Sequence, residues 1–99
     1  MSVSMITYRK GGTHDKVVAA TKKLKAVMEK HGATGVTLGQ QTAGPNPGEW
    51  VIRIHCTSWE AFGKMMQNAM SDAKGREAVA GLDAITEMLS RRIISGVDL

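Results

Sequence analysis

The chain has 99 residues, of which 42% are hydrophobic, and 13 lysines and arginines stand against 9 aspartates and glutamates, for a net charge of +4. This length allows one domain, residues 1–99, and excludes two. With 22% charged residues and eleven glycines, the composition excludes disordered and collagen-like chains. A domain of this size buries only about 60 to 65% of its unfolded surface, so we expect a second copy to complete its core.

The expected cellular compartment follows from three features that the sequence lacks: a signal peptide, a membrane-spanning segment and a set of cysteines. The segment from Met1 to Lys10 has neither the basic start nor the continuous apolar run of a signal peptide. No stretch approaches the roughly 18 to 20 apolar residues that cross a bilayer. Cys56 is the single cysteine, and three histidines with scattered acids do not make a zinc site. We therefore expect a cytoplasmic protein with no metal, no cofactor and no membrane contact.

The first predicted elements are a strand and a helix. Residues 2–9 alternate, which predicts a strand with Val3, Met5 and Thr7 on one face and Ser4, Ile6 and Tyr8 on the other. Thr13 is expected to cap a helix that Gly32 ends. Apolar residues recur along this helix at helical spacing, opposite a set of five lysines: Lys16, Lys22, Lys23, Lys25 and Lys30.

A hairpin is predicted next. Residues 33–42 are rich in β-branched side chains and predict a strand, and the glycines and prolines of residues 43–48 predict a turn. Residues 49–56 alternate clearly and predict a third strand. Its apolar side, which we expect under the helices, consists of Trp50, Ile52, Ile54 and Cys56, and its other side consists of Val51, Arg53 and His55.

A second helical region and a last strand complete the chain. Thr57 or Ser58 is expected to cap a helix, with Glu60 in its first turn. We predict a break between residues 70 and 76, followed by a short helical piece toward Ala80 in which Gly75 is a weak point. The β-branched run over residues 84–94 predicts the final strand.

The order βαββαβ predicts an α+β fold with a four-stranded antiparallel sheet and both helices on one face. The other sheet face is then bare. The alternation of the strands places Ile6, Tyr8, Arg53 and His55 on it. Such a face is too apolar for water and too polar for a dry core, which is typical of a lined cavity.

The chain resembles the dimeric α/β-barrel superfamily in this order of elements and in its length near 100 residues. It also resembles that superfamily in a divided last helix with Ser71-Asp72 in its middle and in the strand-to-helix junction Ile54-His55-Cys56-Thr57-Ser58-Trp59-Glu60. That ferredoxin-like group includes antibiotic-biosynthesis monooxygenase-like and NIPSNAP-like domains. The resemblance implies a homodimer in which two sheets face each other and enclose one pocket per subunit.

Six residues are candidates for lining that cavity. Arg53 and His55 point the same way about 6.6 to 6.8 Å apart and can converge on a small anion. The alternative is that Arg53 pairs with Glu87 or another acid and that His55 is an ordinary surface or interface histidine. Tyr8 can add its hydroxyl, Trp59 is either a roof or a packing anchor, and only one of Arg91 and Arg92 can face the cavity, because neighbours on a strand point oppositely.

These residues favour a homodimer that binds a small anionic or aromatic organic molecule. The alternative is a cofactor-independent monooxygenase or an isomerase in the same cavity. The resemblance also raises haem degradation, for which family members use an Asn on the first strand, a Trp near the end of the third and a His on the last helix. Only Trp59 lies near a matching place here, and the Asn and the His are missing. RNA binding is a remote alternative, because the third strand lacks the aromatic residues that stack bases, so we expect no nucleic-acid partner.

Overall fold

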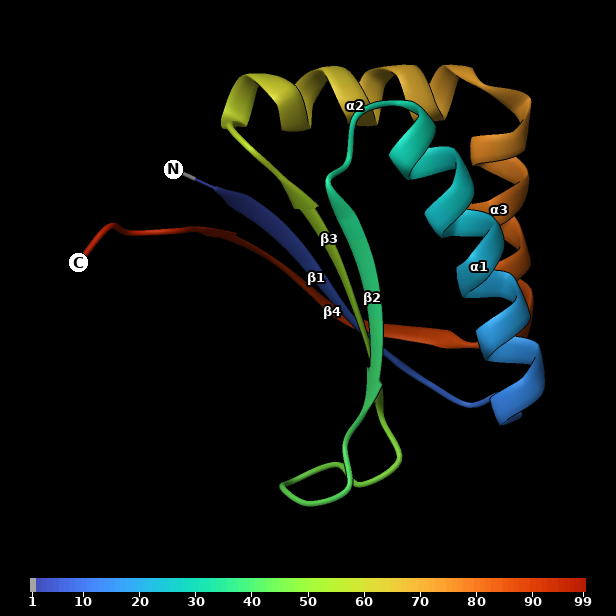
Figure 1. Cartoon of the computed structure of the whole chain (residues 1–99). Coiled ribbons are helices and arrows are strands. Elements are labelled where there is room, and N and C mark those ends of the chain that lie inside the picture. Colours follow the sequence, from blue (N-terminus) through green and yellow to red (C-terminus); the bar gives the residue numbers. More distant parts are fainter. Residues whose placement is uncertain (1) are drawn as a thin grey trace.

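Four strands and three helices make up the computed structural model, which describes residues 2–99 (Figure 1). The strands form one antiparallel sheet in the order β2-β3-β1-β4. The N-terminal strand therefore lies inside the sheet, between the third and the last. In chain order the elements are β1 (Val3–Lys10), α1 (His14–Lys30), β2 (Gly35–Gln40), β3 (Trp50–Cys56), α2 (Trp59–Ser71), α3 (Ala73–Ile85) and β4 (Glu87–Ser95).

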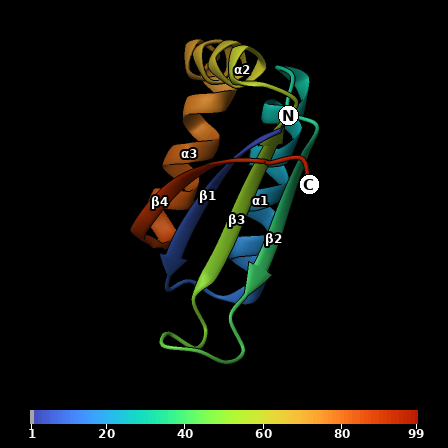
Figure 2. The same ribbon diagram turned by 90° about the vertical axis from the view of Figure 1, so that its left-hand side faces the viewer.

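All three helices cover the same face of the sheet (Figures 1 and 2). Helices α1 and α3 lie side by side and run in opposite directions, and α2 crosses one end of the layer (Figure 1). The predicted α+β, ferredoxin-like arrangement with one bare sheet face is confirmed. The molecule is thin for its width, with extents of 37 × 33 × 17 Å, because it has only these two layers.

The core lies between the sheet and the helices. The apolar side of β3 is buried there as predicted, and so are Val3 and Met5 of β1. Met5 and the β3 residues Ile52, Ile54 and Cys56 form one cluster with residues of all three helices: Leu24, Val27 and Met28 of α1, Met65 and Ala69 of α2, and Ala78 and Leu82 of α3. Helical spacing places the apolar residues of each helix on one side, and that side faces the sheet.

The last helical region differs from the prediction at its end. Residues Ala84 and Ile85, expected in the final strand, form the last turn of α3, and the helix does not stop near Ala80. Gly81 lies within the helix. Helical hydrogen bonding continues past it, and the last bond runs from the Thr86 amide to the Leu82 carbonyl. The strand β4 accordingly begins at Glu87.

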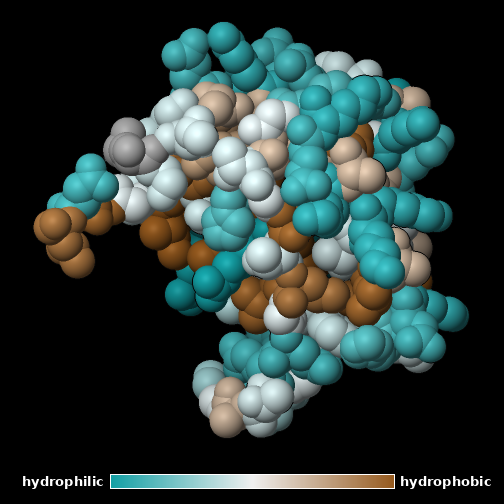
Figure 3. All heavy atoms as spheres, in the orientation of Figure 1, coloured by the Kyte–Doolittle hydropathy of each residue, from teal (hydrophilic) through white to brown (hydrophobic). Residues whose placement is uncertain are grey.

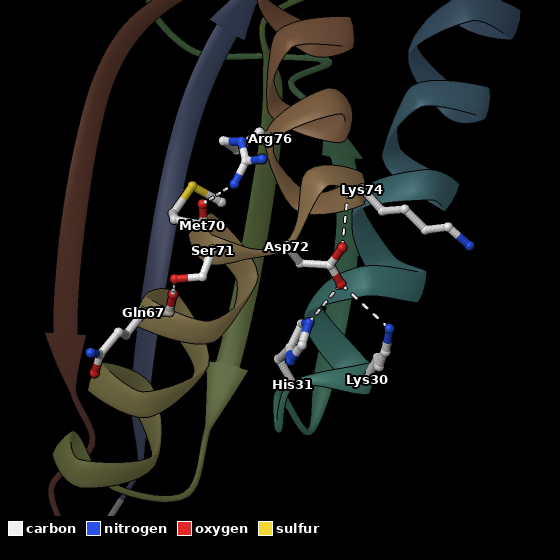
Figure 4. A network of polar contacts seen from close by, with 8 residues as sticks. All are labelled: Lys30, His31, Gln67, Met70, Ser71, Asp72, Lys74 and Arg76. Atoms are coloured by element: carbon white, nitrogen blue, oxygen red, sulfur yellow. Dashed lines mark hydrogen bonds and ion pairs between the residues drawn. The ribbon is translucent and has the colours of Figure 1, made fainter.

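The predicted break falls at Asp72, between α2 and α3 (Figure 4). Its extended backbone ends one helix, and its side chain accepts a hydrogen bond from the Lys74 amide and so caps the next. The other carboxylate oxygen lies 2.9 Å from His31 Nε2 and 3.4 Å from Lys30 Nζ. Asp72 therefore ties the α2–α3 joint to the end of α1. At the start of α2, Ser58 rather than Thr57 is the cap.

Within residues 2–99, no helix is long and apolar enough to cross a membrane. The same residues contain no cluster of three or more histidine, cysteine or acidic side chains that could hold a metal ion.

Candidate ligand-binding face

The strand register determines which side chains share the bare sheet face. Ser4 pairs with His55 and Ile94, Ile6 pairs with Arg53 and Arg92, and Tyr8 pairs with Val51 and Ser90. On β2, the residues of this face are the register partners of His55, Arg53 and Val51, which are Gly35, Thr37 and Gly39. We define the bare face by these residues: Ser4, Ile6, Tyr8, Gly35, Thr37, Gly39, Val51, Arg53, His55, Ser90, Arg92 and Ile94.

Two arginines flank one isoleucine at the centre of this face. Arg53 and Arg92 are the register partners of Ile6 on either side, which puts their Cα atoms about 10 Å apart. Ile6 is only 6% exposed although no helix covers it. The aliphatic stems of arginine cover apolar surface while the guanidinium groups stay in water, which accounts for this burial. Two guanidinium groups so placed can both reach one anion lying above Ile6.

No strand position of the bare face carries an acid, so the two arginines are not neutralised within the sheet. The alternative partner Glu87 lies 3.3 Å from Lys10 Nζ instead. Among residues 2–99, no ion pair includes Arg53 or Arg92. Within the described part of the single chain, Arg53 therefore does not pair with Glu87, and both arginines are exposed.

The register also separates the two neighbouring arginines of β4. Arg92 faces the bare side, where its guanidinium carbon lies 5.4 Å from the centre of the Tyr8 ring, within the range of a cation–π contact. Arg91 pairs with Thr7 and points to the helical side of the sheet. Arg92 is thus the member of the pair that shares a face with Tyr8, Arg53 and His55.

His55 lies one pair of residues further along the same face, hydrogen-bonded to Ser4. Ser4 Oγ and His55 Nδ1 are 2.8 Å apart. In the tautomer in which Nδ1–H donates to the Ser4 oxygen, Nε2 carries a lone pair that can accept a proton. The role of Ser4 was not predicted, because its contact with His55 depends on the register between β1 and β3, which strand alternation does not determine.

Two hollows open on the bare face of the single chain. One, of about 290 Å³, lies beside Arg53 and Val51, along β2. The other, of about 380 Å³, lies beside His55 and includes Ser2, Val97 and Asp98. Arg53 and His55, neighbours on the same face of β3, therefore each border a space of ligand size.

Trp59 and Cys56 belong to the helical side. Trp59 begins α2, is half exposed, and packs edge-on against Phe62 with ring centres 6.2 Å apart. Cys56 is buried, and burial raises the pKa of its thiol, which disfavours a thiolate. Arg9, whose burial on this side was not predicted, donates to the Asp83 carboxylate at 2.8 Å and so holds α3 to β1.

The chain matches no protein-family model and no curated protein. It is similar in structure to SnoaB, a cofactor-independent oxygenase from Streptomyces nogalater, with a TM-score of 0.76 and 12% identity over 99% of this chain and 95% of that one.

A proposed antibiotic biosynthesis monooxygenase from Chloroflexus aurantiacus J-10-fl gives a TM-score of 0.70, with 14% identity over 99% of this chain and 95% of that one. A similarly described protein from Nitrosomonas europaea gives 0.66, with 14% identity over 99% and 100%. At these identities the likeness shows the fold alone, a ferredoxin-like arrangement that this chain shares with the three solved structures.

Proposed function

We propose that two copies of this chain pair through their bare faces and enclose a cavity that binds a small organic anion with an aromatic or apolar body. The observation that carries this proposal is the row Arg53–Ile6–Arg92, which presents two unneutralised guanidinium groups on either side of an apolar side chain. Arginine binds a carboxylate with two parallel hydrogen bonds. Tyr8 and Val51, which are partly exposed, supply apolar contacts for the rest of the molecule.

The thinness of the molecule supports the pairing. Its single sheet has helices on one side only, and the bare face holds Ile94, which is 49% exposed. Two four-stranded sheets that close into an eight-stranded barrel enclose an interior wide enough for side chains and one small ligand. A second copy would convert the two open hollows into parts of an enclosed space.

Binding is tested with a matched pair of probes, 1-naphthoate and its neutral amide, by titration calorimetry. We expect the carboxylate to bind more tightly than the amide. Arg53→Ala and Arg92→Ala should each weaken naphthoate binding about 10- to 100-fold, because each removes a charge-assisted hydrogen-bond donor.

Arg91→Ala is the matched control, since it removes the same charge from the adjacent position of β4 on the other face. It should leave the Kd unchanged. Equal binding of the two probes, or equal loss in Arg91→Ala and Arg92→Ala, would contradict the proposal.

A second candidate, catalysis without a cofactor, is favoured by the hydrogen bond between Ser4 and His55 and by the likeness to a cofactor-independent oxygenase. Here His55 Nε2 would act as a general base that removes a proton from an acidic C–H bond of the substrate. The resulting carbanion either takes up a proton at a different carbon atom, which is isomerisation, or reacts with O2. In the latter case a CH2 group becomes C=O, and the second oxygen atom leaves as water with both hydrogens.

Proton removal is common to both reactions, so it is measured directly. We expect the protein to accelerate exchange of the methylene hydrogens of indane-1,3-dione with deuterium from D2O, read by NMR. His55→Ala should lower that acceleration about 10²- to 10⁴-fold, and Ser4→Ala should lower it less. If the protein does not accelerate exchange above the rate in buffer, or if His55→Ala accelerates it as much as the wild type, the catalytic proposal fails and only the binding proposal remains.

A further inference from the structure

A second concave surface lies on the opposite side of the molecule, in the helical layer. It is a groove of about 660 Å³ between the neighbouring helices α1 and α3. Its floor consists of apolar and mostly small residues, and its small side chains account for the hollow: Ala19, Ala20, Ala26, Val27, Ala78 and Gly81. We call this surface the α1–α3 groove. It faces away from the bare sheet face and would stay open in the proposed dimer.

The borders of the α1–α3 groove are strongly basic. Lys16, Lys23 and Lys30 line the α1 border, and Lys74 lies on the α3 border beside one acid, Glu77. The hydrophilic residues of α1 appear as a teal band, with hydrophobic surface between and below them, in Figure 3. Among residues 2–99, no ion pair includes Lys16, Lys23 or Lys74, whereas Lys30 lies 3.4 Å from Asp72.

The spacing of the α1 lysines indicates the shape of the partner. They are seven residues apart, which is two helical turns, so successive lysines lie about 10 Å apart along one edge of α1. A ligand with a single anionic head group would use one lysine and leave the others unmatched. A helix with acidic residues at positions i, i+7 and i+14 matches the whole row.

The floor is suited to a helix as well. Alanine and glycine let a third helix approach closely, toward the short end of the usual range of interaxial distances, about 8 to 10 Å. Apolar side chains at i+3, i+4 and similar positions of the partner would lie in the groove. A second copy of this chain is disfavoured, because its own α1 edge is equally basic and would repel this one.

We propose that the α1–α3 groove docks an acidic amphipathic helix of another protein, with the acidic edge of that helix along Lys16, Lys23 and Lys30. The site is independent of the cavity on the bare face. It would allow this protein to be attached to a partner while its sheet face holds a ligand.

The proposal is tested with a synthetic 18-residue helical peptide that carries Glu at i, i+7 and i+14 and Leu along the neighbouring stripe. A second peptide carries Lys in place of the three Glu residues. By fluorescence anisotropy we expect the acidic peptide to bind and the basic one not to bind. Raising the salt from 50 to 300 mM should weaken binding, since exposed charge pairs are screened.

Three protein variants locate the binding. Lys16→Glu with Lys23→Glu should raise the Kd about tenfold or more, because two attractive pairs become repulsive. Lys22→Glu with Lys25→Glu, an equal charge change on the same helix outside the groove, should have a much smaller effect. Gly81→Leu should block the floor without loss of folding, since nothing lies within 4 Å of a Cβ atom at this position.

Other outcomes overturn the proposal. These are failure of the acidic peptide to bind, equal weakening by the two double variants, and unchanged binding in Gly81→Leu. Preferential binding of anionic phosphatidylglycerol vesicles over the peptide would assign the groove to a lipid surface instead.

Discussion

Gly75 stands at the closest approach between α2 and α3. The position is buried, and a Cβ atom there would collide with the carbonyl oxygen of Ala69, which belongs to the backbone of the preceding helix. Backbone atoms cannot rotate away as a flexible side chain can. The sharp turn at Asp72 therefore requires glycine at this position.

Gly75→Ala is expected to lower the free energy of unfolding by about 2 to 3 kcal/mol, because overpacking forces the two helices apart. Gly63→Ala is the matched control inside α2, where nothing lies within 4 Å of an added Cβ atom. It should raise stability by about 0.5 to 1 kcal/mol through helix propensity. Urea unfolding measures both, and an unchanged midpoint for Gly75→Ala would contradict the explanation.

Single residues also show where sequence patterns are sufficient and where they are not. Strand alternation correctly put Tyr8, Arg53 and His55 on one face, because side chains alternate strictly along a strand. It could not choose between Arg91 and Arg92, since the two residues that follow, Ile93 and Ile94, are both apolar and alternation gives no facing there. Gly75 was predicted only as a weak point of a helix. Its packing role could not be predicted, because the close approach to Ala69 exists only once the two helices have packed.

At the scale of elements, the α2–α3 joint depends on one charge. His31 and the Lys74 amide hold the pKa of Asp72 down at about 2, below its usual 3.8, and Lys30 adds to this. A carboxyl group whose pKa is lower in the folded state stabilises the fold above its unfolded pKa. This contribution is lost as the pH falls from about 4 toward 2.

Asp72→Asn should therefore be less stable than the wild type near neutral pH, and the difference should shrink between pH 4 and pH 2. Asparagine can still accept the bond from the Lys74 amide, so the comparison isolates the charge. Thermal unfolding at a series of pH values measures the difference. A gap between the two proteins that stays constant down to pH 2 would refute the role of this carboxylate.

The helix ends also show which features a sequence pattern predicts and which depend on contacts in the folded chain. The break near Asp72 was predictable, because Ser-Asp before a helical segment is a capping signal. The end of α3 was misplaced by five residues, at Ala80 instead of Ile85, because Gly81 disfavours a helix by propensity alone. Packing of Ala78 and Leu82 in the core outweighs that preference.

At the scale of the whole molecule, β4 provides the sharpest test of the proposed dimer. Ile93 and Ile94 are adjacent and almost equally exposed, at 45% and 49%, but they point to opposite faces of the sheet. Ile94→Glu places a charge on the bare face, where pairing would bury it at a large cost. We expect its dimer Kd to rise on the order of a hundredfold.

Ile93→Glu changes the charge and the hydrophobicity equally and should leave the dimer Kd near that of the wild type. Sedimentation at micromolar concentration measures both variants. A wild-type chain that sediments as a single 10.6 kDa species would rule out the dimer.

The central place of β1 has a consequence for how the chain acquires its structure. This strand precedes both of its neighbours in the chain, residues 50–56 and 87–95, and Val3 pairs with Ser95. Such distant pairings close slowly, because the entropy of a long loop is lost before the contacts form. During synthesis, the hydrogen-bonding edge of β1 that β4 will occupy stays open until residues 87–95 emerge. The growing chain is thus most vulnerable to wrong strand pairing in the interval before β4 is available.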